Sequence, residues 1–133
     1  MAELMVPISP GELIDKITIL EIKSQRMTDA TKLHNVRKEL SLLSDTWQVS
    51  PFAATDISTE WAGLRDVNAK LWDIEDRIRD KERDGLFDAG FVELARAVYF
   101  TNDERAAIKK QINAKLGSAL VEEKSYASYT RSG

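Results

Sequence analysis

The chain has 133 residues, of which 43% are hydrophobic and 31% are charged, and its formal net charge is −3. This length supports one domain with its own core, and the absence of cysteine excludes disulfides, thiol catalysis and cysteine-ligated zinc. The sequence pI of about 5.3 and the lack of a lysine and arginine block disfavour a nucleic-acid partner. No apolar run approaches the roughly 18 residues that span a bilayer, and the N-terminus does not resemble a signal peptide. We therefore expect a soluble cytoplasmic protein with no membrane partner.

The first predicted helix covers residues 9–27 and has apolar residues on more than one side. Ser9 is a candidate N-cap, and Glu12 completes an S-x-x-E capping box. At about 100° per residue most apolar side chains form one stripe, whereas Ile19 and Ile22 lie on roughly the opposite side. One neighbouring element cannot cover both sides. Ile19 and Ile22 must therefore meet either the C-terminal helices or a second chain, and we predict a homodimer through this helix.

The second predicted helix covers residues 30–47, with Thr28 or Asp29 as its cap. Only a few residues separate it from the first helix, so we expect the two to form an antiparallel hairpin. Residues 48–59 follow as the longest irregular stretch, because Pro51 and several Ser, Thr and Asp residues interrupt the helical period.

The third predicted helix covers residues 59–84 and stops at Gly85. At 1.5 Å per residue it is about 39 Å long, which makes it the spine of the predicted fold. Two further helices are expected over residues 88–100 and 101–116. The break between them is placed at a second capping box formed by Thr101 and Glu104.

The fold class that these elements predict is all-α, an antiparallel helical bundle of five to six helices with one long central helix. Residues 118–125 are the candidate sixth helix. We expect a single domain over residues 1–133, with an ordered core over about residues 6–126 and a frayed tail at residues 127–133.

A line of polar and aromatic residues on the third predicted helix is the first candidate site. The line has spacings of four, three, four and three, so it forms one strip beside the apolar stripe. Trp and Arg are favoured anchors of binding surfaces. The alternative, which we prefer from the sequence alone, is a boundary between two helices where the Trp covers the core edge. The strip consists of Asn68, Trp72, Glu75, Arg79 and Glu82.

Arg105 is the second candidate, because it stands near the centre of an apolar stripe in the first turn of the predicted fifth helix. An unpaired arginine is costly to bury, and it opposes the positive end of the helix dipole. We expect it to pair with a carboxylate, for which Glu75 and Glu93 are candidates, or with an anionic ligand. The structural ion pair is the preferred interpretation.

Three more residues complete the candidate ligand site: Arg96, Lys124 and Tyr126, of which the last two lie in a C-terminal segment that forms either a flap or a packed helix end. The neighbouring carboxylates Asp73, Glu75 and Asp76 are able to bind Mg²⁺ with a phosphate substrate. Acid and base residues alternate around them, however, and a salt-bridged solvent face explains that pattern without any function.

Three segments resemble a family of small uncharacterised proteins of bacteria and phages, catalogued as a domain of unknown function. They are Ser9–Lys23, Leu71–Asp76 and Glu122–Tyr126, and the resemblance covers about residues 6–129. It implies no activity, so it transfers no catalytic residue.

The functional prediction rests on the absence of any catalytic signature in the sequence. One histidine and no cysteine nearly exclude a Ser-His-Asp or Cys-His arrangement, and no phosphate-binding glycine motif is present. We predict a non-enzymatic binding or assembly module with no catalytic residue, metal or cofactor. The alternative is an enzyme or sensor that acts on a small anionic or phosphorylated metabolite, with or without Mg²⁺. It predicts a concave pocket in which at least two of the candidate arginines converge.

Overall fold

The computed structural model describes residues 3–129, and every regular element in that range is helical, which confirms the all-α class. The predicted frayed tail lies partly outside these residues, since residues 130–133 are not among them. No helix of the described part is long and apolar enough to cross a membrane. The elements are α1 (Pro10–Arg26), α2 (Ala30–Val49), the short 3-10 helix η1 (Pro51–Ala54), α3 (Ser58–Arg83) and α4 (Ala89–Leu116).

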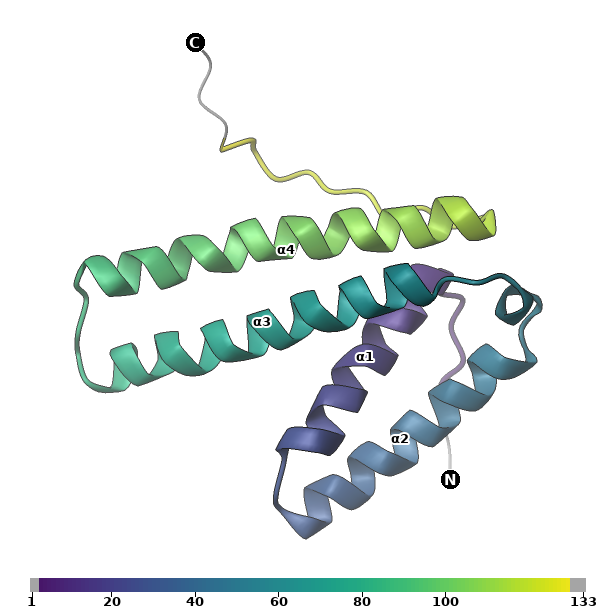
Figure 1. Cartoon of the computed structure of the whole chain (residues 1–133), viewed down its shortest axis with the longest axis horizontal. Coiled ribbons are helices and arrows are strands. Elements are labelled where there is room, and N and C mark those ends of the chain that lie inside the picture. The colour runs from purple at the N-terminus through teal and green to yellow at the C-terminus, as the bar shows by residue number, and fades with distance from the viewer. Residues whose placement is uncertain (1–2, 130–133) are drawn as a thin grey trace.

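The helices form two pairs that cross at a steep angle (Figure 1). Short links at residues 27–29 and 84–88 join α1 to α2 and α3 to α4, and the partners in each pair lie side by side. Because the pairs cross, the helix axes do not run along one common direction. Helix α1 contacts each of the other three helices, so the element at the centre is α1 and not the long third helix that we predicted.

The predicted fourth and fifth helices are one continuous helix, α4, so the expected count of five to six helices is corrected to four in the described residues. Thr101 caps nothing, because it lies in the middle of α4 with only 1% of its surface exposed. No glycine or proline occurs between residues 91 and 116, so nothing breaks the helical backbone there. The sixth helix is also absent, since Gly117 ends α4 in a left-handed conformation with φ of 65° and residues 118–129 are not helical.

The core lies where α1 crosses α3 and α4. Ile14, Leu64 and Ile112 come from these three helices and are completely buried. Burying one such side chain contributes about 1.5–3 kcal/mol, so this crossing is the main source of hydrophobic stabilisation. The edge of the core is closed by Trp47 and Trp61, whose rings meet edge to face with centroids 5.9 Å apart.

The second apolar side of α1 is covered within the single chain. Ile22 is only 3% exposed, and Ile19 is half-buried beside residues of α3 and α4. Ile22 therefore needs no second chain to be buried. The homodimer through Ile19 and Ile22 stays a prediction.

Candidate functional site

A groove between α3 and α4 brings together five of the eight predicted site residues. Its volume is about 490 Å³, and α1 contributes Ile19 to its wall. We call it the α3–α4 groove. The predicted residues that line it are Asn68, Trp72, Glu75, Arg79 and Arg105, and Leu71, Asp76 and Asn102 complete the wall.

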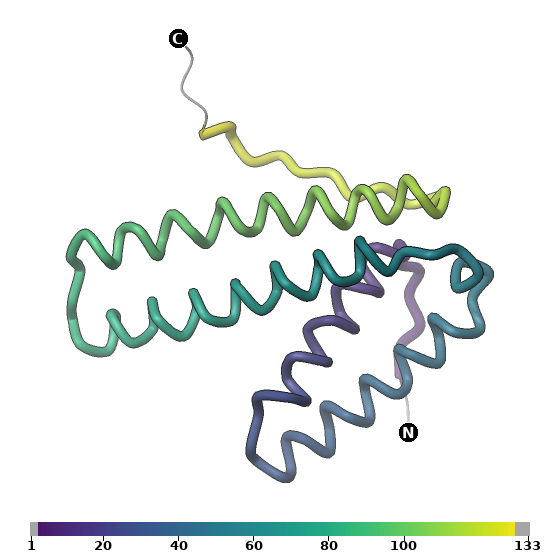
Figure 2. Tube along the Cα trace, viewed as in Figure 1, coloured from purple at the N-terminus to yellow at the C-terminus, as the bar shows by residue number. Residues whose placement is uncertain are grey.

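A second groove adjoins the first and contains two more of the predicted residues. The C-terminal tail turns back after Gly117 and runs along α4 (Figure 2), and it forms one wall of this groove. We call it the tail groove; its volume is about 330 Å³. Lys124 and Tyr126 line it from the tail, and Lys109 lines it from α4. Asn102 and Arg105 line both grooves, so they stand at the junction.

Arg96 is the one predicted site residue that lines neither groove. It is exposed on α4, and its guanidinium lies over the ring of Phe100, 5.6 Å from the centroid. The structure therefore separates Arg96 from the other seven residues. The spacing of Arg96 and Arg105 explains this, because nine residues place them about 180° apart around a helix.

Arg105 is half-buried, and no carboxylate in residues 3–129 lies within ion-pair distance of it. The structural ion pair that we preferred from the sequence is therefore not formed. Glu75 is bonded to Arg79 on its own helix, with Nε and Oε2 3.1 Å apart. The argument from the helix dipole also fails, since Arg105 lies in the interior of α4 and not in a first turn.

The other cations that line the two grooves, Arg79, Lys109 and Lys124, have carboxylate partners, and so has Arg26 beside Trp72. Arg26 bonds Asp73 at 2.6 Å, and its guanidinium lies 5.9 Å from the ring centroid of Trp72. Lys124 in the tail bonds Asp103 of α4 at 2.8 Å. Among residues 3–129, Arg105 is thus the groove-lining guanidinium that no carboxylate bonds.

Lys109 is a buried cation that sequence reasoning missed. It is only 6% exposed, and its ammonium lies 2.6 Å from a carboxylate oxygen of Glu12 and 2.9 Å from one of Glu122. A third carboxylate, that of Asp15, is 3.9 Å away. The charge of Lys109 is thus compensated from α1 and from the tail at once. Its position one helical turn after Arg105, between the partly buried Ile108 and the buried Ile112 of α4, was the signal that could have found it.

The pKa values of Lys109 and Glu12 are both shifted in the direction that favours their charged forms. Burial disfavours the charged form of Lys109, but its hydrogen bonds to Glu12 and Glu122 outweigh burial and raise its pKa above the usual value. Burial likewise opposes ionisation of Glu12, and the hydrogen bond and charge of Lys109 outweigh it and lower the pKa of that carboxyl. Both groups are therefore charged at neutral pH.

The side chain of Asn68 lines the groove, but its hydrogen bonds are made to α1. It is buried, and its amide nitrogen donates to Asp15 at 2.9 Å and to the hydroxyl of Thr18 at 3.0 Å. These bonds join α3 to α1 beneath the groove. Because both amide hydrogens are used, only the oxygen of Asn68 is available to a ligand.

The carboxylates that we considered as Mg²⁺ ligands do not form a cluster. Asp73 bonds Arg26 and Glu75 bonds Arg79, which is the salt-bridged pattern that the sequence favoured. Within residues 3–129, no three His, Asp or Glu side chains are placed so that they could hold a metal ion.

Over the described part of the chain, this geometry defines an all-helical protein with a polar groove and a guanidinium that no carboxylate there bonds. The model of a family of unknown function, DUF6165, matches residues 4–132, and the chain belongs to this family. No curated protein and no solved structure matches this chain. Membership brings no assigned activity, so the functional argument rests on the grooves themselves.

Proposed function

We propose that this protein is a non-enzymatic binding module whose α3–α4 groove holds a small anionic ligand, with Arg105 as the residue that contacts the anion. The observation that supports this is the state of Arg105, a half-buried guanidinium at the junction of two grooves with no carboxylate partner in the described residues. Such a group loses hydration without gaining a counter-charge. A carboxylate or phosphate restores that loss through charge-assisted, often bidentate hydrogen bonds.

Two neighbours of Arg105 fit the same ligand. The half-buried indole of Trp72 provides a flat apolar wall, and Asn102 lies one turn before Arg105 on α4 and offers an amide. Tryptophan beside arginine is a frequent combination at binding hot spots. We place this function in the cytoplasm, because a chain without cysteine is suited to a reducing compartment.

The test measures anion binding by wild type, Arg105→Gln and Arg96→Gln, using calorimetry or NMR titration with inorganic phosphate and with succinate. Arg96→Gln is the matched control, since it removes the same charge from the same helix outside both grooves. We expect Arg105→Gln to weaken binding by about tenfold or more, the value of a charge-assisted hydrogen bond, and Arg96→Gln to change it by less than about twofold.

Two results contradict the proposal. In the first, neither anion binds wild type up to about 10 mM, a weak limit for even one charged contact. In the second, both variants weaken binding equally, which is the behaviour of a diffuse charge effect. Circular dichroism of Arg105→Gln separates lost binding from lost folding.

A further inference from the structure

The C-terminal tail lies along α4 without regular structure of its own. Residues 118–129 are not helical, and nearly all of them are exposed. The tail is held at separate points along α4, of which two are ion pairs: Glu122 with Lys109 at 2.9 Å and Lys124 with Asp103 at 2.8 Å. The third point is Tyr129.

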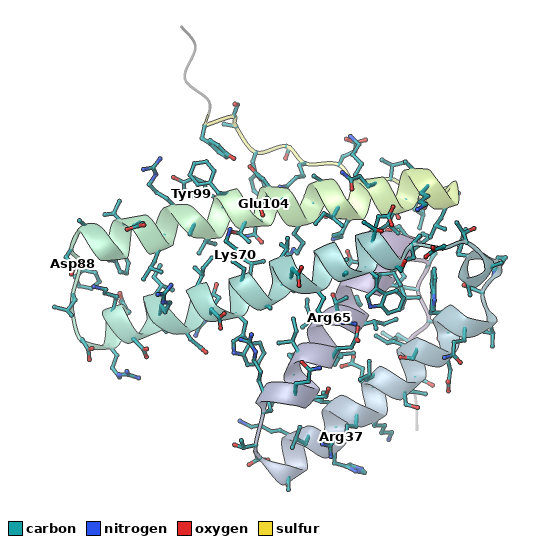
Figure 3. All side chains as sticks on the ribbon, viewed as in Figure 1. Arg37, Arg65, Lys70, Asp88, Tyr99 and Glu104 are labelled. Atoms are coloured by element: carbon teal, nitrogen blue, oxygen red, sulfur yellow. The ribbon has the colours of Figure 1, made fainter. Side chains whose placement is uncertain are left out.

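Tyr129 contacts α4 through a hydrogen bond with Asp103 and through aromatic rings. Its ring lies 4.8 Å from that of Phe100 and 5.3 Å from that of Tyr99, which stands on the side of α4 that the tail follows (Figure 3). Between these points the tail forms walls of grooves and not part of the core. A segment whose side chains are nearly all exposed and which contributes nothing to the buried core is the kind that opens locally before the rest of the fold.

Glu122 occupies the place of an anion in the tail groove. Its carboxylate bonds Lys109, a buried cation, while nearly half of the Glu122 side chain (49%) stays exposed. The other carboxylates near Lys109, those of Glu12 and Asp15, belong to α1 and are part of the helix scaffold. Of the three, only Glu122 belongs to the exposed tail.

We propose that Glu122 is a built-in competitor for the anionic ligand, so that the ligand binds across Arg105 and Lys109 when the tail releases Lys109. This inference rests on the proposed function. Arg105 and Lys109 are one turn apart on α4 and line the same groove, and side chains at this spacing are neighbours. A ligand with two negative charges, such as phosphate or a dicarboxylate, is able to contact both cations.

The charge of the tail also favours release. Glu122 and Glu123 both line the tail groove, so an anion that approaches Arg105 meets two like charges as long as the tail is in place. Removing the Glu122 carboxylate from Lys109 relieves this repulsion and frees one donor of the ammonium.

The experiment compares full-length wild type, Glu122→Gln and Glu123→Gln, with inorganic phosphate as the probe. Glu123→Gln is the matched control, because it removes the same charge from the next residue, which has no ion pair with Lys109. We expect Glu122→Gln to lower the Kd for phosphate by about two- to fivefold, the value of one partly exposed ion pair. Glu123→Gln removes like-charge repulsion but no ion pair, so we expect it to lower the Kd by less than about 1.5-fold.

Hydrogen exchange of the tail amides is the second measurement. We expect phosphate to speed exchange over residues 118–129 in wild type, and Glu122→Gln to speed it without phosphate. If the tail amides of wild type and of Glu122→Gln exchange at the same rate without phosphate, the inference is overturned, since Glu122 then does not hold the tail.

The outcomes also separate this inference from the function on which it rests. Phosphate binding that depends on Arg105 supports the proposed function. If Glu122→Gln then leaves the Kd unchanged or raises it, or if phosphate slows hydrogen exchange of the tail amides, the tail is a wall of the site. The inference that Glu122 competes with the ligand is then wrong. If neither phosphate nor succinate binds any variant, including Glu122→Gln, the proposed function fails and the inference falls with it.

Discussion

Gly11 lies where the first turn of α1 touches α4, and this contact leaves no room for a side chain. A Cβ atom at position 11 would stand 2.6 Å from the carbonyl oxygen of Lys109 and 2.9 Å from Oδ1 of Asn113. The first of these atoms belongs to the backbone of α4 and cannot rotate away. The N–H of Gly11 also donates to Oδ1 of Asn113 at 2.7 Å, so moving α1 outward breaks that bond. Gly11→Ala therefore creates a clash, and the shift of α1 that partly relieves it also breaks this hydrogen bond, so both costs apply.

The magnitude follows from three effects. Alanine in place of glycine favours a helix by at most about 1 kcal/mol. Overpacking a close contact costs about 1–3 kcal/mol. Leaving a buried backbone N–H and its partner unpaired costs about 1–3 kcal/mol more. We expect Gly11→Ala to lower the free energy of unfolding by about 3 kcal/mol, which lowers the Tm of a chain of this length by roughly 10 °C.

Gly63→Ala is the matched control on α3. Its Cβ would meet only Cδ1 of Ile108 at 3.6 Å, which is ordinary van der Waals contact. The helix preference then acts alone, and we expect a gain of up to about 1 kcal/mol. Urea unfolding followed by circular dichroism at neutral pH measures both variants. The reasoning is refuted if Gly11→Ala is as stable as wild type while Gly63→Ala gains stability, because α1 then does not approach α4 this closely.

Three further substitutions test the buried network and the site. Lys109→Met is expected to cost about 2 kcal/mol at neutral pH, because it leaves partly buried carboxylates unpaired. The pKa of Glu12 is lowered by Lys109, so the contribution of the Glu12–Lys109 pair to stability is present above about pH 4.5 and is lost as the pH falls through the folded-state pKa of Glu12. Near pH 3, urea unfolding should therefore give a smaller difference in unfolding free energy between Lys109→Met and wild type. A difference that stays constant with pH contradicts this reasoning. Asn68→Ala removes the amide that bonds Asp15 and should cost about 1–3 kcal/mol in the same assay, whereas no loss would mean that water replaces it. Arg105→Met is expected to leave stability unchanged or raise it by up to about 1 kcal/mol while abolishing phosphate binding, and a clear loss of stability contradicts the ligand role.

The start of helix α1 was predictable because a few adjacent residues determine it. Ser9 accepts a hydrogen bond from the N–H of Glu12 at 3.2 Å, and Pro10 occupies the first helical position, as the sequence indicated. The other half of the predicted capping box, a bond from the N–H of Ser9 to the Glu12 carboxylate, is not formed. The Glu12 carboxylate bonds Lys109, which is 97 residues away, and no local pattern encodes a partner at that distance.

The break predicted at Thr101 was wrong for a related reason. A T-x-x-E pattern describes a helix start only where the chain is free to begin one, and here Thr101 is buried inside a helix that nothing interrupts. The strip on α3 was visible because it repeats with the helical period, and Arg105 was visible as a charge among apolar residues. Their convergence depends on how α3 packs on α4, which the period of either helix alone does not contain. The part of Lys109 and Glu122 in the site depends on the tail turning back over α4.

Replacing Arg105 and replacing Lys109 are expected to change the free energy of unfolding in opposite directions. Lys109 has carboxylate partners from two parts of the chain, so its charge stabilises the fold and its loss is destabilising. Arg105 is half-buried with no carboxylate partner in residues 3–129, so we expect its charge to contribute nothing to the stability of the unliganded fold or to lower it slightly. The ligand that we propose for it binds the folded state and stabilises that state by RT ln(1 + L/Kd), where L is the ligand concentration, so the effect rises with the logarithm of that concentration. The two cations are one turn apart on the same helix. A stabilising effect of removing Arg105 and a destabilising effect of removing Lys109 would therefore distinguish a binding residue from a structural one in the same groove.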